Sequence, residues 1–139
     1  MQWPTSLRPL QLSACLFLVP LALAVRARCF FGAFVYAVNW VASVANHSAT
    51  NEHAGLIHVI DLGAIALWLA YNSCKTIALT AEGSPPAAAV ALAAAVGLLN
   101  HRRRAFAFLS RRRQQEQLHA LMHAAGASGS SLLMLCTTS

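Results

Sequence analysis

The chain has 139 residues, of which 58% are hydrophobic and only 10% are charged, and its formal net charge is +6. Soluble domains carry about 25% charged residues, and the mean hydropathy of +0.55 is correspondingly high. This composition excludes an ordinary soluble domain. It favours a single transmembrane domain that spans residues 1–139.

Most of the positive charge lies in one short stretch. Six of the ten basic residues form two triple-arginine runs, at 102–104 and 111–113. Beside apolar helices, such a cluster is typical of a membrane surface, so we expect the Arg102–Arg113 loop to bind anionic lipid head groups. A nucleic-acid partner is not expected, because no aromatic-rich soluble module accompanies the arginines.

The four cysteines do not form a metal-binding pattern. They are scattered along the chain, each in or beside an apolar run, and no CxxC spacing occurs. A cysteine zinc site is therefore not supported. We interpret these residues as small hydrophobic side chains.

The first predicted helix covers about 10–25 and contains Pro20, which is able to kink it. It is short for a spanning helix, which needs about 17–25 residues. A cleaved signal peptide is the alternative, with residues 21–24 as its small-residue cleavage region. The next apolar run begins almost at once, at residue 29, so we favour a retained helix.

Two further helices follow, at about 29–45 and 56–73, separated by a polar, turn-rich linker at 46–55. For the second of these helices, continuation to Leu79 is an alternative. Asp61 lies in its first or second turn, where the helix dipole favours a carboxylate.

The break at 82–86 contains Gly83, Pro85 and Pro86 and precedes a fourth predicted helix at about 87–99. A basic loop at 100–116 leads to the fifth helix, at about 117–136. The sequence thus predicts an all-α fold, a polytopic transmembrane bundle of about five helices. The number falls to four if the first segment is a cleaved signal.

Metal-capable residues interrupt these apolar helices. Ser43 and His47 are four residues apart, as are His119 and His123, and residues at this spacing share one helix face. Ionisable groups in membrane helices are costly, which indicates a functional site. Three neutral imidazoles, from His47, His119 and His123, make a catalytic zinc set with one position left for water, whose pKa zinc lowers to about 7. Asp61 would act as general base or hold a ligand, and Ser43 would bond the water, a ligand or a substrate carbonyl.

The predicted topology brings these residues to one depth. Five crossings put the N-terminus, the 46–55 linker and the 100–116 loop on one side of the membrane. The 26–28 and 74–86 connections then lie on the other side. Because most of the arginines fall on the first side, the positive-inside rule assigns it to the cytoplasm. We therefore expect the metal site near the cytoplasmic face.

The motifs around this site resemble a known superfamily. Ser43-x-x-x-His47, then Ile60-Asp61-Leu62-Gly63-Ala64-Ile65-Ala66, then His119-x-x-x-His123-Ala124-Ala125-Gly126-Ala127 are similar to the pattern of the alkaline ceramidases, the progestin/adipoQ receptors and the hemolysin III proteins. Members of that superfamily have seven helices, so this chain would be a reduced version. The resemblance implies that His47, His119 and His123 ligate zinc, with Asp61 and Ser43 completing the site. It also implies hydrolysis of a lipid amide or ester, such as ceramide.

Two function classes follow from the sequence. The first is an integral-membrane, zinc-dependent hydrolase acting on a membrane lipid. The alternative is a non-enzymatic multi-pass protein, a receptor, scaffold or degenerate paralogue, with a structural zinc or no metal. Among the remaining histidines, His58 shares a face with Asp61 and is an alternative ligand or hydrogen-bond partner. His53 and His101 are interpreted as loop and interfacial residues.

Overall fold

The computed structural model describes residues 9–48, 55–81 and 112–137, and every regular element within these ranges is helical. In chain order these are α1 (Pro9–Ala14), the 3₁₀ turn η1 (Cys15–Phe17), α2 (Leu18–Arg26), α3 (Phe30–Ser48), α4 (Gly55–Ala81) and α6 (Arg112–Thr137). The predicted all-α class is confirmed for these residues. The predicted helix at 87–99 and residues 100–111 of the predicted basic loop lie outside them.

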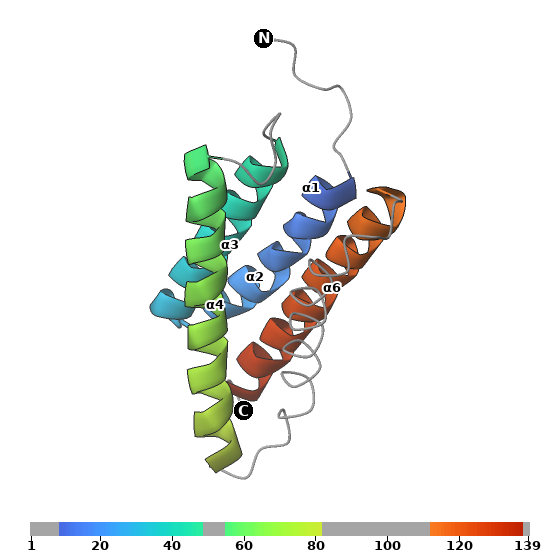
Figure 1. Cartoon of the computed structure of the whole chain (residues 1–139). Helices are drawn as coiled ribbons and strands as arrows, with labels where there is room; N and C mark the ends of the chain where they lie inside the picture. Colours follow the sequence, from blue (N-terminus) through green and yellow to red (C-terminus); the bar gives the residue numbers. More distant parts are fainter. Residues whose placement is uncertain (1–8, 49–54, 82–111, 138–139) are drawn as a thin grey trace.

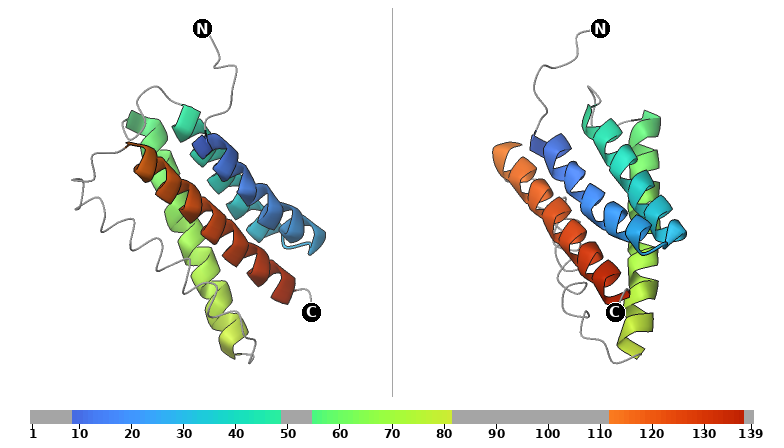
Figure 2. Two further views of the ribbon diagram at one scale, coloured as in Figure 1. Left: turned by 90° about the vertical axis from the view of Figure 1, so that its right-hand side faces the viewer. Right: turned by 180° about the vertical axis from the view of Figure 1, so that it is seen from behind.

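The helices pack as four rods, because α1, η1 and α2 follow one another without a break (Figure 1). The rod α1–α2 lies between α3 and α6, and α4 packs against α3 and α6. The direction of α6 matches that of α1–α2 and is opposite to that of α3 (Figure 2). The starts of α1, α4 and α6 and the end of α3 therefore meet at one end of the bundle.

Pro20 accounts for the irregular turn in the first rod. Proline has no N–H, so the carbonyl of Leu16, four residues earlier, loses its partner in the helix. The chain adopts the 3₁₀ turn η1 at Cys15–Phe17, directly around that carbonyl. The disturbance expected from Pro20 thus takes the form of one tightened turn.

The reversal between α2 and α3 takes only a few residues. The Arg28 amide donates to the Val25 carbonyl (3.0 Å) and the Cys29 amide to the Ala24 carbonyl (2.9 Å). These two bonds form a Schellman motif, which places Arg28 in the left-handed region at φ 54°. Glycine is the usual residue there, so the arginine carries a conformational cost of about 1–2 kcal/mol.

Several helix ends differ from the predicted ones. α3 continues to Ser48 instead of 45, and α6 begins at Arg112 instead of 117. α4 continues to Ala81, past residue 73 and close to the alternative end at Leu79. No glycine or proline interrupts the added stretches, and the arginines, glutamines and glutamate at 112–116 are good helix formers. The last residues of the predicted basic loop are therefore the first turn of α6.

Two of the described helices are long and apolar enough to cross a membrane. They are the Gly55–Leu79 part of α4 and the His119–Thr137 part of α6. Leu10–Arg26 is apolar as well but shorter.

An apolar and aromatic cluster holds the rods together. Its buried members come from every rod: Ala24, Val35, Tyr36, Tyr71 and Met134. The Tyr71 ring meets the rings of Tyr36 and Phe31 edge to face, at centroid distances of 5.8 and 5.7 Å. Gly32 permits this approach, because a Cβ there would lie 3.0 Å from Tyr71 Cζ.

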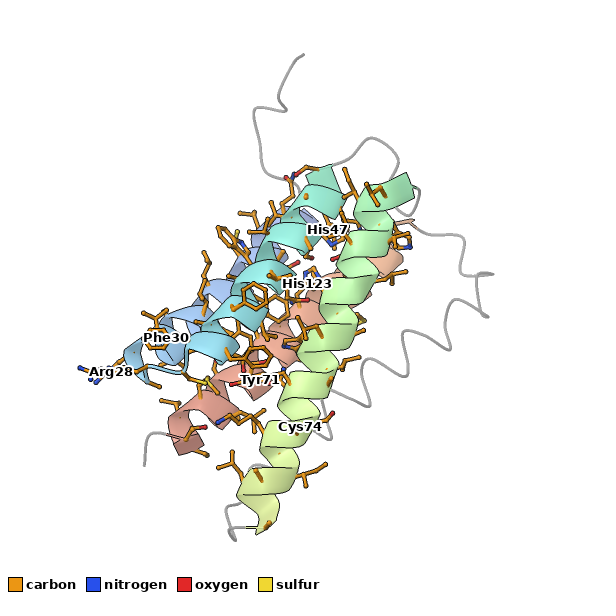
Figure 3. The ribbon with its side chains drawn as sticks, turned by 90° about the vertical axis from the view of Figure 1, so that its left-hand side faces the viewer. Arg28, Phe30, His47, Tyr71, Cys74 and His123 are labelled. Carbon is orange, nitrogen blue, oxygen red and sulfur yellow. The ribbon has the colours of Figure 1, made fainter. Side chains whose placement is uncertain are left out.

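The interior of the bundle is polar as well as apolar. One face of α3 buries Asn39, Ser43 and His47, each less than 5% exposed. On the outer face of α3, Phe30 is 75% exposed and Val41 56%. Figure 3 shows the same contrast, with His47 inside the bundle and Phe30 on its outside. This distribution is the reverse of a soluble bundle, in which polar side chains face outward.

Candidate metal centre

Three histidines converge at the end of the bundle where α3 stops and α6 starts. His47 lies in the last turn of α3, and His119 and His123 lie one turn apart on α6. One ligand nitrogen from each lies within 4.8 Å of the other two. The three ring centroids are 4.7 to 5.4 Å apart. These residues are therefore close enough to bind one metal ion, as the sequence predicted.

The donor set fits a metal ion of the zinc type. Tetrahedral zinc with bonds of about 2.0–2.1 Å separates its ligand nitrogens by about 3.3 Å. Closing from 4.8 Å to that separation requires a shift of under about 1 Å by each ring. Neutral imidazoles are suitable ligands, and the site is well shielded, since His47 is 0% and His123 7% exposed.

Ser43 lies beside one of the histidines. It is buried one turn before His47, and its Oγ is 3.4 Å from His123 Nε2. The hydroxyl therefore contacts a ring nitrogen of one of the three clustered histidines. In that position it is able to hydrogen-bond a further ligand of the metal or a substrate carbonyl.

Asp61 is held at the same end of the bundle by a different partner. It is 5% exposed, and its Oδ2 accepts a hydrogen bond of 2.8 Å from Asn46 Nδ2. Asn46 directly precedes His47, so the carboxylate ties α4 to the last turn of α3. Within the described part of the chain, the metal-capable group consists of the three histidines, and Asp61 lies outside it.

The remaining histidines and the arginine runs are not part of the three-histidine cluster in the described part of the chain. His58 is half-buried on α4 and does not belong to the histidine group among the residues that the structure describes. His53 and His101 lie outside the described ranges, as do the arginines of the first triple run. Arg112 and Arg113 begin α6.

The first rod supplies site residues that the sequence did not identify. Ser13 Oγ lies 2.8 Å from His123 Nδ1, and Gln11 Nε2 donates to Ser48 Oγ at 2.8 Å. These contacts link α1 to both histidine-bearing helices. The sequence does contain a signal for these two residues, because Gln11 and Ser13 are the only uncharged polar side chains, apart from Cys15, between Leu10 and Val25.

Two aromatic side chains pack beside the site, Phe17 against His123 and Trp68 against Phe17. The Phe17 ring meets His123 at a centroid distance of 5.9 Å and Trp68 at 5.8 Å, both edge to face. Trp68 Nε1 donates to Ser130 Oγ at 3.0 Å, which fixes the indole against α6. Gly126 leaves room for it, because a Cβ there would lie 3.1 Å from Trp68 Cζ2.

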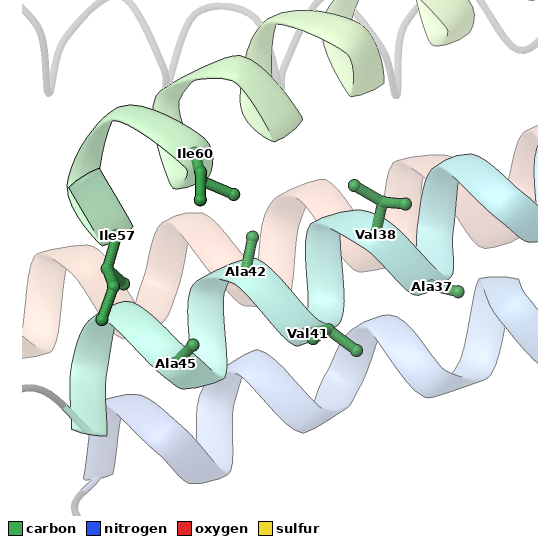
Figure 4. Close-up of a pocket in the computed structure, with 7 residues that line it drawn as sticks. All are labelled: Ala37, Val38, Val41, Ala42, Ala45, Ile57 and Ile60. Atoms are coloured by element: carbon green, nitrogen blue, oxygen red, sulfur yellow. The ribbon is translucent and has the colours of Figure 1, made fainter.

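An apolar groove lies between α3 and α4 (Figure 4). Its volume is about 370 Å³, and its walls are five alanines and valines of α3 between Ala37 and Ala45, with Ile57 and Ile60 of α4. Ala42 and Ile60 of this lining directly precede Ser43 and Asp61. The groove therefore shares the helices α3 and α4 with Ser43, His47 and Asp61, and its lining is apolar.

The chain was compared with protein-family models, curated proteins and solved structures, and none of them matches it.

Proposed function

We propose that the chain is a multi-pass membrane protein with a zinc centre at His47, His119 and His123, and that it hydrolyses an amide or ester bond of a membrane lipid. The convergence of three histidines from two helices, with the Ser43 hydroxyl beside them, is the observation that carries this proposal. The resemblance of the same residues to the alkaline ceramidase, progestin/adipoQ receptor and hemolysin III superfamily supports it.

The distribution of side chains supports the membrane location. Large apolar residues cover the outside of α3 and α4, while polar and ionisable residues face inward. Lipid favours this arrangement, because a polar group is costly against hydrocarbon and is retained where helices enclose it. Two of the described helices are also long enough to span a bilayer.

The chemistry is assigned as follows. Zinc, when bound by the three histidines, supplies a Lewis acid and a water that ionises near neutral pH. Ser43 would orient the scissile carbonyl by a hydrogen bond. Asp61, beside the end of α3, would accept the proton from the attacking water. The apolar groove between α3 and α4 has a lining that suits an acyl chain of the substrate.

A structural metal is the second candidate, and the burial of the site favours it. His47 is fully buried and His123 nearly so, with the Phe17 ring against the latter. A closed zinc site would brace α3 against α6 in a receptor or scaffold without any reaction.

The orientation in the membrane is part of the proposal. By the positive-inside rule, the histidine end of the bundle faces the cytoplasm. The test is labelling of a single cysteine at Ser48 or at Ser110, in a background without the native cysteines, using a reagent that does not cross membranes. Both positions should react from the cytoplasmic side. Labelling from opposite sides would contradict the proposed topology.

Metal content and hydrolysis together test the function. Purified protein in detergent should contain one zinc per chain, and His119→Ala and His123→Ala should lose most of it, because each lacks one of three ligands. The zinc-loaded protein should release fatty acid from a panel of ceramides and related lipid amides and esters. Zinc without any hydrolysis would favour the structural metal, and protein without zinc would overturn both candidates.

A further inference from the structure

Ser13 connects the first rod to the histidine cluster. Its Oγ lies 2.8 Å from His123 Nδ1, although the two residues are 110 positions apart in the sequence. Ser13 is half-buried on α1 and His123 is 7% exposed on α6. The contact therefore depends on the packing of these two helices.

The direction of the hydrogen bond follows from the second contact of Ser13. The hydroxyl donates its only proton to the Leu10 carbonyl, at 2.9 Å. When that bond is made, only lone pairs remain on Ser13 Oγ for His123, and we assign the imidazole as the donor of this contact, through Nδ1–H. A neutral imidazole has a single N–H, and Nε2 is therefore left with its lone pair.

The second ring nitrogen of His123, Nε2, contacts Ser43. Nε2 of His123 lies 3.4 Å from Ser43 Oγ, on the opposite side of the ring from Ser13. The Phe17 ring, 5.9 Å from the imidazole, restrains its tilt. Histidine ligands commonly donate their other N–H to a fixed acceptor, which sets the tautomer and raises the basicity of the ligand nitrogen.

The first rod is also anchored near the other ligand helix. Gln11 donates to Ser48 Oγ at 2.8 Å, and Ser48 follows His47. Ser48 in turn donates to the Val44 carbonyl at 2.7 Å. The turn Gln11–Ser13 thus bridges the end of α3 and the first half of α6, so Ser13 is held at a fixed distance from His123.

We infer that Ser13 is a positioning residue of the metal centre, which holds His123 as the Nδ1–H tautomer and presents Nε2 to the metal. This inference rests on the proposed zinc centre and adds the first rod to it as a functional part. Ser13 acts through His123 and does not contact the metal itself.

The test measures zinc affinity by competition with a chromophoric chelator, in purified protein of full length. Ser13→Ala removes the acceptor and should weaken zinc binding by about 10–100-fold, the usual effect of losing such a partner. Ser13→Thr keeps a hydroxyl and should restore affinity near that of the parent. Ser131→Ala is the matched control, because Ser131 on α6 donates within its own helix, to the Ala127 carbonyl.

Two further readouts separate positioning from stability. Nitrogen-15 spectra of metal-free protein labelled at histidine should show His123 protonated at Nδ1 in the parent and in Ser13→Thr. In Ser13→Ala the signal should shift toward the Nε2–H form, with the metal-free unfolding midpoint little changed. The rise of that midpoint on adding zinc should shrink in Ser13→Ala alone.

The outcomes are distinct. Zinc bound by Ser13→Ala as tightly as by the parent, or an unchanged His123 tautomer, would overturn the role of Ser13 and leave the zinc centre standing. Parent protein that binds no zinc would overturn the zinc centre and the inference with it. If Ser131→Ala weakened zinc binding as much as Ser13→Ala does, the loss of affinity would not be specific to the Ser13–His123 contact, and this result would also overturn the inference.

Discussion

Replacement of Asp61 by asparagine should separate metal binding from catalysis. The Asp61 carboxylate is buried and accepts a 2.8 Å hydrogen bond from Asn46, next to His47. Asparagine has nearly the same shape and its carbonyl oxygen can accept the same bond, so the link between α4 and α3 should remain. What the substitution removes is the negative charge and the capacity to take a proton.

The substitution should affect stability, zinc affinity and turnover to different extents. Changing a charge-assisted hydrogen bond of about 1.5–3 kcal/mol into a neutral one of about 0.5–1.5 kcal/mol should lower stability by about 1 kcal/mol. Zinc affinity should stay close to that of the parent, since all three histidines remain. Turnover should fall by about 10²–10⁴-fold, which is the usual contribution of a general base. That loss corresponds to about 3–5 kcal/mol in the activation free energy.

The assay combines zinc titration, fatty-acid release from a long-chain lipid amide in detergent, and thermal unfolding. A double-mutant cycle with Asn46→Ala and Asp61→Ala controls for the structural bond and should give a coupling energy of about 1.5–3 kcal/mol. If Asp61→Asn loses zinc about 10–100-fold and turnover falls in parallel, Asp61 only braces a ligand. Unchanged turnover with full zinc occupancy would refute any catalytic role for Asp61.

Two substitutions at glycines and one at the α2–α3 reversal test the packing. Gly32→Ala should destabilise the bundle by about 1–3 kcal/mol, because the new methyl group would clash with the Tyr71 ring. In Gly63→Ala the added Cβ has nothing within 4 Å, so the substitution should stabilise α4 by about 0.5–1 kcal/mol. The thermal midpoint should therefore fall in Gly32→Ala and rise in Gly63→Ala, and midpoints that shift in the same direction in both variants would contradict the structure. Arg28→Gly should raise the midpoint by relieving about 1 kcal/mol of left-handed strain at φ 54°. A lower midpoint would mean that the Arg28 side chain contributes more than its backbone costs.

The sequence by itself determined the helical character and the pattern of histidines. Long apolar runs bounded by polar breaks predicted α3, α4 and α6, because hydrophobicity and helix propensity are local properties. The spacing of His119 and His123 placed them on one helix face for the same reason. The predicted order of five helices, including the one at 87–99 that lies outside the described residues, placed His47 at their level, since successive membrane helices were expected to alternate in direction.

Helix ends were less predictable, because they depend on small local differences. The additions at Ser48, Ala81 and Arg112 contain no helix breaker, and good helix formers extend a helix past the end of its apolar run. The reversal at Arg28 also escaped prediction. A left-handed arginine is unfavourable locally, and it is tolerated because α2 and α3 must turn back on each other within a few residues.

Only the tertiary structure decided which side chains complete the site. Ser13 meets His123 across 110 positions, and Asn46 meets Asp61 across the linker between α3 and α4. Such pairs depend on how each helix is rotated about its axis and shifted along it. Rotation and shift are set by side-chain packing, here by Phe17 against Trp68 and by the close approach of Tyr71 at Gly32. No local pattern encodes them, because the packing of one helix face depends on every neighbouring helix at once.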